Sequence, residues 1–389
     1  MMKKLLGILL IISLFLYVCC EERNAYKQFK LGVRYSRGQG VEQDYKKAIY
    51  WYKKSAEQGH PQSQHNLGVM YSNGLGVEQD YKQAFYWYKK AAKQGEVEAQ
   101  YNLGVMYDQG IGLEQNYKQA FYWYKKSAKQ GEAEAQYNLG VMYYEGIGVE
   151  QNYKQAVYWS KKSAEQGMAA AQYNLGGMYD QGIGVEQNYK QAFYWWKKAA
   201  EQGMAEAQHN LGLMYSNGQG VLQDYKQAFY WWKKAAEQGY ATAQYNLGGM
   251  YLQGQEVKQN YKQAYYWYKK SAKQGDAIAQ HNLGLMYSNG QGVLQDYKQA
   301  FYWWKKAAEQ GYATAQYNLG KLYSNGLGVI EDYAKAHMWW NISAYSGDLR
   351  AAEHREKVTK NMTSQQIEEA QRMAKEWIDK FEKRKKKKD

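Results

Sequence analysis

The stretch AQYNLGVMYDQGIGLEQNYKQAFYWYKKSAKQGE, residues 99–132, decides the fold, because close copies of it fill most of the chain. Its Leu103-Gly104 pair occurs in nine copies, each 36 residues from the next. Residues 207–248 and 279–320 are identical. A fixed period of this length is typical of a solenoid, in which each unit packs only on its neighbours. The 389 residues therefore predict a row of repeats rather than two or three globular domains.

The first half of each copy has the pattern of a helix, here called helix A. Leu103, Met106 and Tyr107 share one apolar side at helical spacing. Gly104 lies beside this stripe, although a glycine inside a helix costs about 1 kcal/mol relative to alanine. Because that cost recurs in all nine copies, we expect Gly104 to let a second helix approach closely. Gly110 is expected to end helix A.

The second half of each copy predicts a helix B. Asn116 is a favourable N-cap, Gln119 stands where a capping box needs it, and Gly131 is expected to stop the helix. Two positions elsewhere break the pattern: Ser160 replaces an aromatic residue of helix B, and Glu256 replaces the second loop glycine. The side of helix B that we expect to be buried carries Tyr117, Ala120, Trp123, Tyr124, Ser127 and Ala128.

The N-terminal segment, residues 1–20, resembles an export signal. Two lysines form a charged start before the apolar run Leu5–Val18. That run is shorter than the roughly 20 residues that a membrane-spanning helix needs, so no membrane span is expected. Two interpretations stay open: cleavage after Cys20, or a lipid anchor on Cys19. Both cysteines of the chain lie here, which excludes a disulfide framework within the repeats.

The formal net charge is +14, but its distribution argues against a nucleic-acid binder. The last ten residues, Lys380–Asp389, hold seven basic and two acidic side chains. The remaining excess is spread over the repeats, whereas nucleic-acid binders concentrate basic charge on one face. We therefore expect no nucleic-acid partner.

One motif underlies all the copies: A-x-x-x-L-G-x-x-Y-x-x-G-x-G-V-x-x-D/N-x-x-x-A-x-x-W-x-x-x-A-A-x-x-G. This motif resembles the Sel1-like repeat, a relative of the tetratricopeptide repeat, and the resemblance covers about residues 30–347. It implies an all-α fold: an α/α superhelical solenoid of nine 36-residue, two-helix repeats with C-terminal capping helices. The A helices of such a solenoid line a concave groove. The segment Met362–Ile367 is similar to the start of the closing helix of bacterial members.

The resulting domain plan has four segments. Residues 1–20 form a signal peptide, of the simple or the lipoprotein type, and residues 26–347 form the nine Sel1-like repeats. Residues 348–381 are expected to form capping helices, because the end of a solenoid must be covered. Residues 382–389 form a basic tail.

No catalytic constellation stands out. His65, His209 and His281 occupy the position of Tyr101, but in different repeats. Metal ligands must converge on one ion at about 2 Å, which histidines in separate repeats are not expected to do. The carboxylates recur at repeating positions, which is typical of a solvated face. We therefore expect no catalytic residue, no metal, no cofactor and no enzymatic activity.

Variation among the copies points to a binding surface on helix A. The positions of Tyr101, Val105 and Asp108 vary and fall opposite the apolar stripe, so we expect them to face outward. Asn102 recurs from the second repeat onward beside that face. Two interpretations stay open for it: a ladder that binds a peptide backbone, or a bond between helices that orders the stack. The candidate partner-binding residues are Tyr101, Asn102, Tyr137, Asn138, Tyr173, Asn174, His209, Asn210, Tyr245, Asn246, His281 and Asn282.

These features predict a non-enzymatic, monomeric scaffold that binds a protein or peptide in its groove. The family resemblance implies complex assembly, envelope regulation or host interaction, and the signal segment implies a bacterial protein that is periplasmic, envelope-attached or secreted. One alternative is a polyanion or cell-surface binder that uses the tail and the lysine-rich convex face of the B helices, formed by Lys118, Lys125, Lys129 and their equivalents. A second is a β-lactam-binding or β-lactam-hydrolysing enzyme, as in some cysteine-rich secreted relatives, whose repeats carry paired cysteines that these repeats lack.

Overall fold

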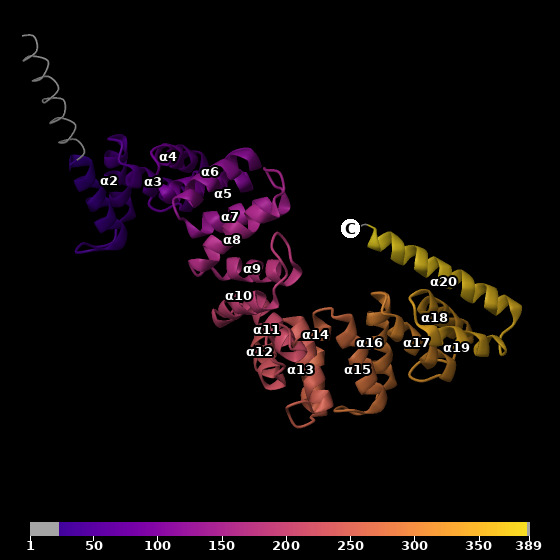
Figure 1. Ribbon diagram of the computed structural model, residues 1–389. Coiled ribbons are helices and arrows are strands. Elements are labelled where there is room, and N and C mark those ends of the chain that lie inside the picture. Colours follow the sequence, from indigo (N-terminus) through magenta and orange to yellow (C-terminus); the bar gives the residue numbers. More distant parts are fainter. Residues whose placement is uncertain (1–22, 387–389) are drawn as a thin grey trace, which may run out of the picture. The chain divides into compact units, whose positions relative to one another are not determined.

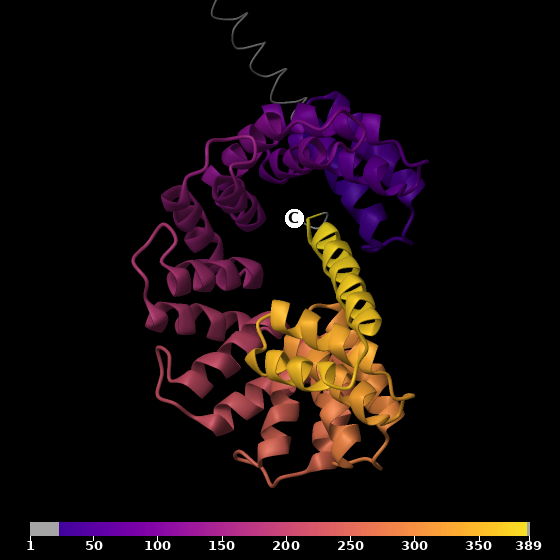
Figure 2. The same ribbon diagram turned by 90° about the vertical axis from the view of Figure 1, so that its right-hand side faces the viewer.

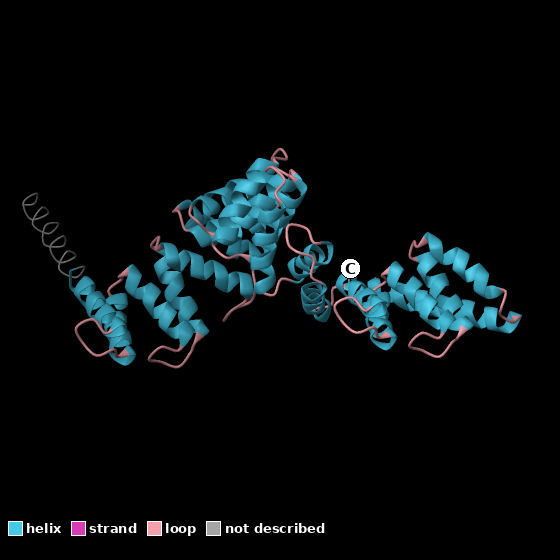
Figure 3. Cartoon of the chain, turned by 90° about the horizontal axis from the view of Figure 1, so that it is seen from below, coloured by secondary structure: helices cyan, strands magenta, loops and turns pink. Residues whose placement is uncertain are grey.

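The computed structural model describes residues 23–386, which consist of helices and connecting loops (Figures 1 and 3). The chain divides into two compact units, Met1–Lys198 (unit 1) and Ala199–Asp389 (unit 2). Within each unit, A and B helices follow one another in pairs (Figure 2). The predicted all-α solenoid of nine two-helix repeats, followed by C-terminal helices, is confirmed.

Two of the expected segments fall wholly or partly outside this description. The signal segment 1–20, with Cys19, is not among the described residues, and neither is the end of the expected tail, residues 387–389. Among residues 23–386, no helix combines the length and the apolar character that crossing a membrane requires.

Unit 1 begins with a helix A over residues 23–37. Its other A helices are α3 (Pro61–Asn73), α5 (Val97–Gln109), α7 (Ala133–Glu145) and α9 (Ala169–Gln181). Its B helices are α2 (Tyr45–Glu57), α4 (Tyr81–Lys93), α6 (Tyr117–Lys129) and α8 (Tyr153–Glu165). A further helix B, α10 (Tyr189–Glu201), runs across the boundary between the units.

Unit 2 continues the alternation. Its A helices are α11 (Ala205–Asn217), α13 (Ala241–Gln253), α15 (Ala277–Asn289) and α17 (Ala313–Asn325). Its B helices are α12 (Tyr225–Glu237), α14 (Tyr261–Lys273), α16 (Tyr297–Glu309) and α18 (Tyr333–Tyr345). The chain then forms α19 (Leu349–Thr359) and α20 (Ser364–Lys385).

A glycine of helix A faces an aromatic ring of helix B in most repeats. A Cβ atom added to Gly104 would lie 2.6 Å from Cδ1 of Tyr124, and one added to Gly212 would lie 2.3 Å from Cδ1 of Trp232. These separations are too short for a real Cβ, so the expected close approach at the helix-A glycine is confirmed. The indole Nε1 of Trp232 also donates a hydrogen bond to the carbonyl oxygen of His209 at 3.2 Å.

A buried glutamine on helix A and an exposed glutamine at the end of helix B join each repeat to the one before it. The side-chain Nε2 of Gln100 donates to the carbonyl oxygen of Ala92 at 3.1 Å, and its Oε1 accepts from Nε2 of Gln130 at 2.8 Å. Gln130 donates as well to the carbonyl oxygen of Gly95 at 3.1 Å. The bond between the paired glutamines recurs in both units, for example between Gln310 and Gln280 at 2.9 Å. These bonds satisfy polar groups in the interior that would otherwise destabilise the stack.

Helix B begins at the N-cap residue that the sequence predicts. The side chain of Asn116 accepts a hydrogen bond from the backbone N–H of Gln119 at 3.0 Å. Trp123 and Tyr124 are buried. The expectation that Tyr117 is buried is wrong, because this side chain is 41% exposed. Tyr117 is the first residue of α6, and the end of the helix reaches solvent there.

The C-terminal helix α20 packs against the last repeat of unit 2. It begins with a capping box between Thr363 and Gln366. Its Trp377 ring lies 5.9 Å from the ring of Trp339 on α18, centroid to centroid. Figure 1 shows α20 running back along unit 2 from α19. The helix continues to Lys385, into the segment for which the sequence suggested a basic tail.

The expectation that the position of Tyr101 faces outward is wrong for two histidines of unit 2. His209 is only 7% exposed and His281 only 6% exposed. In each case a tyrosine from the start of the next helix A covers the imidazole: the ring centroids lie 5.1 Å apart for His209 and Tyr240, and 5.1 Å apart for His281 and Tyr312. A helical wheel of one helix does not include this neighbour.

The two departures from the repeat pattern have different structural effects. At Ser160 no ring separates the helices, and a Cβ on Gly140 would meet the Ser160 Oγ at 2.7 Å and its backbone N at 3.2 Å. Glu256 has a φ of 57°, and among residues 23–386 it is the one non-glycine residue with a positive φ. In the equivalent loop, a Cβ on Gly292 would lie 2.3 Å from the carbonyl oxygen of Tyr261. Glu256 therefore holds a strained backbone where glycine fits.

We predict that Glu256→Gly stabilises unit 2, because glycine adopts this φ without the cost of about 1 kcal/mol that an L-residue carries. Thermal unfolding followed by circular dichroism should show a higher melting temperature. The reciprocal change Gly292→Glu is the matched control and should lower it. An unchanged or lower melting temperature for Glu256→Gly would remove the interpretation of Glu256 as strained.

We predict that His281 makes the protein less stable as the pH falls from about 6.5 to 4. Burial, with a contribution from the charge of Arg350, lowers the pKa of His281 from 6.5 to about 4. Between these values the unfolded chain binds a proton that the folded chain excludes, so folding loses on the order of 3 kcal/mol. His281→Tyr, which introduces the residue found at Tyr245 and Tyr317, should flatten the melting temperature against pH in this window. Parallel curves for the two proteins would contradict the assignment.

Candidate functional site

The structure places the twelve candidate residues along the A helices of both units. Except for the buried His209 and His281, they are half-buried. They do not converge on one point, because each pair belongs to its own repeat. Those of unit 1 are Tyr101, Asn102, Tyr137, Asn138, Tyr173 and Asn174. Those of unit 2 are His209, Asn210, Tyr245, Asn246, His281 and Asn282.

Two of the asparagines contact the preceding helix A. The Nδ2 of Asn102 lies 3.1 Å from Nε2 of His65, and the Nδ2 of Asn246 lies 3.3 Å from Nε2 of His209. An amide N–H can only donate, so the imidazole nitrogen accepts in both bonds. At these two positions the structure thus has the bond between helices that the sequence left as one of two interpretations.

One cavity of about 500 Å³ lies on the A-helix side of unit 1. Three successive A helices line it: the helix over residues 23–37 contributes Ser36 and Arg37, α3 contributes His65, and the start of α5 contributes Glu96 and Glu98. Side chains of helix α2 complete the wall. The cavity therefore exists only because consecutive repeats stack in this register.

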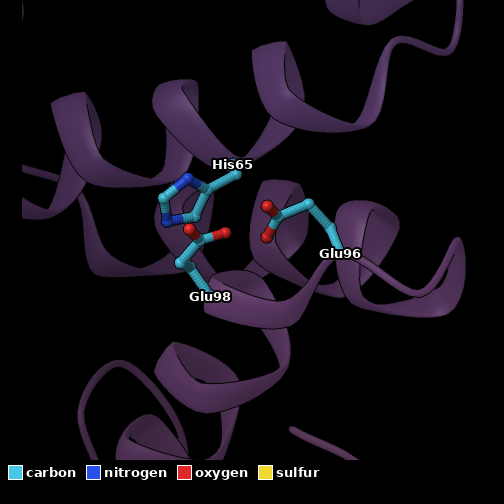
Figure 4. Close-up of side chains that lie close together, drawn as sticks. All are labelled: His65, Glu96 and Glu98. Atoms are coloured by element: carbon cyan, nitrogen blue, oxygen red, sulfur yellow. The ribbon is translucent and has the colours of Figure 1, made fainter. Parts of the chain in front are cut away.

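Within this cavity His65, Glu96 and Glu98 point toward one another (Figure 4). One ligand atom from each residue lies within 4.8 Å of those of the other two. His65 sits in the first half of α3. Glu96 is the N-cap of α5, and its Oε2 accepts a hydrogen bond from the backbone N–H of Ala99 at 2.7 Å. Glu98 lies in the first turn of α5 and is more exposed.

The surroundings of His65, Glu96 and Glu98 shift their pKa values. Burial, helped by the hydrogen bond between the two carboxyl groups, raises the pKa of Glu96 to about 8. The same bond lowers the pKa of Glu98, and burial lowers the pKa of His65. At neutral pH the two carboxyl groups therefore share one proton beside a neutral imidazole.

The sequence predicts no metal site, because the three histidines lie in separate repeats and the carboxylates follow the pattern of a solvated face. The signal lies in the spacing: Glu96 and Glu98 follow His65 by 31 and 33 residues. In a 36-residue solenoid, that spacing joins the middle of one helix A to the start of the next. The spacing becomes informative only once the register between repeats is known.

Comparisons with known proteins give the family. The family model described as "Sel1 repeat" matches nine consecutive segments: residues 28–60, 61–96, 97–132, 133–168, 169–204, 205–240, 241–276, 277–312 and 313–348. No curated protein matches the chain.

Two solved structures resemble the chain over most of its length. One is a protective antigen present in uropathogenic Escherichia coli strains, described as displaying an SLR fold. It is 38% identical, with a TM-score of 0.67, and the match covers 92% of this chain and 84% of that one. The other, a Sel1 repeat protein from Oxalobacter formigenes, is 35% identical with a TM-score of 0.59, and the match covers 79% of this chain and 90% of that one. With its nine matched segments, the chain belongs to the Sel1 repeat family.

Proposed function

We propose that this protein is a non-enzymatic scaffold that binds a protein or peptide on the A-helix surface. The observation that carries the proposal is the cavity of about 500 Å³ between three successive A helices of unit 1. Its walls combine the apolar Phe29, Val33 and Val69 with the polar Ser36 and Asn66. Charged side chains, among them Arg37 and Glu96, also line it, so the cavity offers apolar contacts together with hydrogen-bonding groups that can orient a ligand. Because the walls belong to packed helices, the surface is preformed and costs little ordering on binding.

The same proposal places the protein outside the bacterial cytoplasm, as a periplasmic, envelope-attached or secreted monomer. The charged start and the apolar run of residues 1–20 support export. The relative from uropathogenic Escherichia coli is a protective antigen, and a host can be protected only by immunity to a molecule that it encounters. Complex assembly, envelope regulation and host interaction all fit a scaffold at this location.

The two alternative functions have less support. On helix B, the Nζ of Lys125 stands 5.4 Å from the ring centroid of Phe121, so this lysine already contacts a ring of its own helix. Lys161 likewise pairs with Glu165 at 3.9 Å. These contacts occupy lysine side chains that a polyanion would have to bind. A β-lactam enzyme of the cysteine-rich kind is disfavoured because the repeats contain no cysteine.

We predict that charging the cavity wall weakens partner binding. The double change Val33→Asp and Val69→Asp places carboxylates on the apolar wall and should reduce affinity at least about 10-fold, since each desolvated charge is costly. The partner would be captured on the immobilised full chain, identified by mass spectrometry, and its affinity measured with the purified protein. Val105→Asp with Val141→Asp, at the equivalent helix-A position outside the cavity, is the matched control for folding. Equal affinity for all three proteins would contradict the proposal.

We also predict that the native protein lacks its first 18 to 20 residues. Mass spectrometry of the protein isolated from envelope and culture fluid should find a chain that begins at Glu21 or at an acylated Cys19. A mature chain that retains Met1 would argue against export.

A further inference from the structure

We propose that His65, Glu96 and Glu98 form a binding site for a divalent transition-metal ion, for which Zn²⁺ is the probe. The site goes beyond the proposed scaffold function, because it rests on the geometry of this group alone. An imidazole nitrogen with two carboxylate oxygens is a donor set that suits such ions. Ca²⁺ and Mg²⁺ suit this donor set less well, because they prefer sites made of oxygen ligands alone, from carboxylates, carbonyls and water.

The three ligand atoms are close enough for one ion. They lie within 4.8 Å of one another, whereas ligands of a tetrahedral zinc ion lie about 3.3 Å apart when each is about 2.0 Å from the metal. A small inward rotation closes this difference. Glu98 can make this rotation, because its side chain is exposed to solvent. Binding through Nε2 of His65 replaces the hydrogen bond that this nitrogen accepts from Asn102, because its single lone pair serves only one partner. Glu96 is held by its bond to the Ala99 N–H, which positions its carboxylate toward His65.

The charges of the group call for a cation. Within residues 23–386, no lysine or arginine forms an ion pair with Glu96 or Glu98, although Arg37 lines the same cavity. Two adjoining carboxyl groups in a partly buried site repel each other when both are ionised. A divalent ion displaces the shared proton to solvent, offsets both carboxylate charges and links α3 to α5, the A helices of two consecutive repeats.

Comparison with the equivalent positions in the other repeats distinguishes this site from ordinary helix capping. Carboxylates at a helix N-terminus are favourable by themselves, and Glu132 and Glu134 occupy the same positions at the start of α7. There, however, Tyr101 stands in place of His65. His209 and His281 have the histidine but meet Tyr240 with Thr242, and Tyr312 with Thr314. All three ligands coincide only once among the nine repeats.

Titration of the chelator-treated full chain with ZnCl₂, followed by isothermal calorimetry, tests the site. We expect one equivalent of Zn²⁺ to bind. His65→Tyr, which installs the residue found at Tyr101, should weaken this binding by at least about 100-fold. Glu98→Gln should weaken it by at least about 10-fold, because removing even a group that only orients a metal ligand commonly lowers metal affinity by that factor. The controls His209→Tyr and His281→Tyr should bind as the parent chain does, because those imidazoles are buried elsewhere.

A gain-of-site variant makes the test independent of damage to the fold. Tyr101→His completes a second set with Glu132 and Glu134, so the stoichiometry should rise from one ion to two. Circular dichroism before titration checks that each variant is folded. The proposal is overturned if the parent chain shows no saturable Zn²⁺ binding, or if His65→Tyr leaves binding unchanged. It is also overturned if Tyr101→His adds no second ion, or if Ca²⁺ displaces Zn²⁺ at equal concentration.

Discussion

The contact between a helix-A glycine and a helix-B aromatic ring sets the geometry of most repeats. The ring of Tyr124 or Trp232 lies where a Cβ on Gly104 or Gly212 would be, so the two helices approach to a distance that no larger residue allows. This contact explains why glycine is retained inside a helix despite its cost. Where the ring is missing, at Ser160, the backbone of α8 itself comes close to Gly140. The chain thus keeps the close approach even when the side chain that defines it changes.

A second constraint, the buried glutamine ladder, joins one repeat to the next. The buried Gln100 donates to the carbonyl oxygen of Ala92 in the preceding repeat and accepts from the exposed Gln130 of its own repeat, so its buried amide is satisfied. Buried polar groups with all their partners specify one register, because a slip would leave them unpaired. The register in turn decides which side chain of one helix A meets the start of the next. Every site on this surface therefore belongs to two repeats at once.

Because each site contains residues of two repeats, the same residue type at one repeat position has different surroundings along the chain. The same position carries His65, beside two carboxylates, and His281, beneath a tyrosine ring. The residue type is identical, yet one imidazole opens into a cavity and the other is buried. What differs is the N-cap residue of the following helix A, which is Glu96 in one case and Tyr312 in the other. The surroundings of a side chain on this surface are therefore formed by two consecutive repeats.

The sequence by itself determined the helices, their ends and their number, because these depend on contacts within a few residues: the cap at Asn116, the glycine that ends helix A, and the apolar stripe around Leu103. It also determined the Sel1 fold, since the motif recurs in nine copies. Only the tertiary structure decided the burial of His281, the exposure of Tyr117 and the meeting of His65 with Glu96. The first and third of these features depend on residues about 30 positions apart, whose contact follows from the stacking of one repeat on the next and has no signature within a single copy. Tyr117 is exposed because the end of helix α6 reaches solvent there.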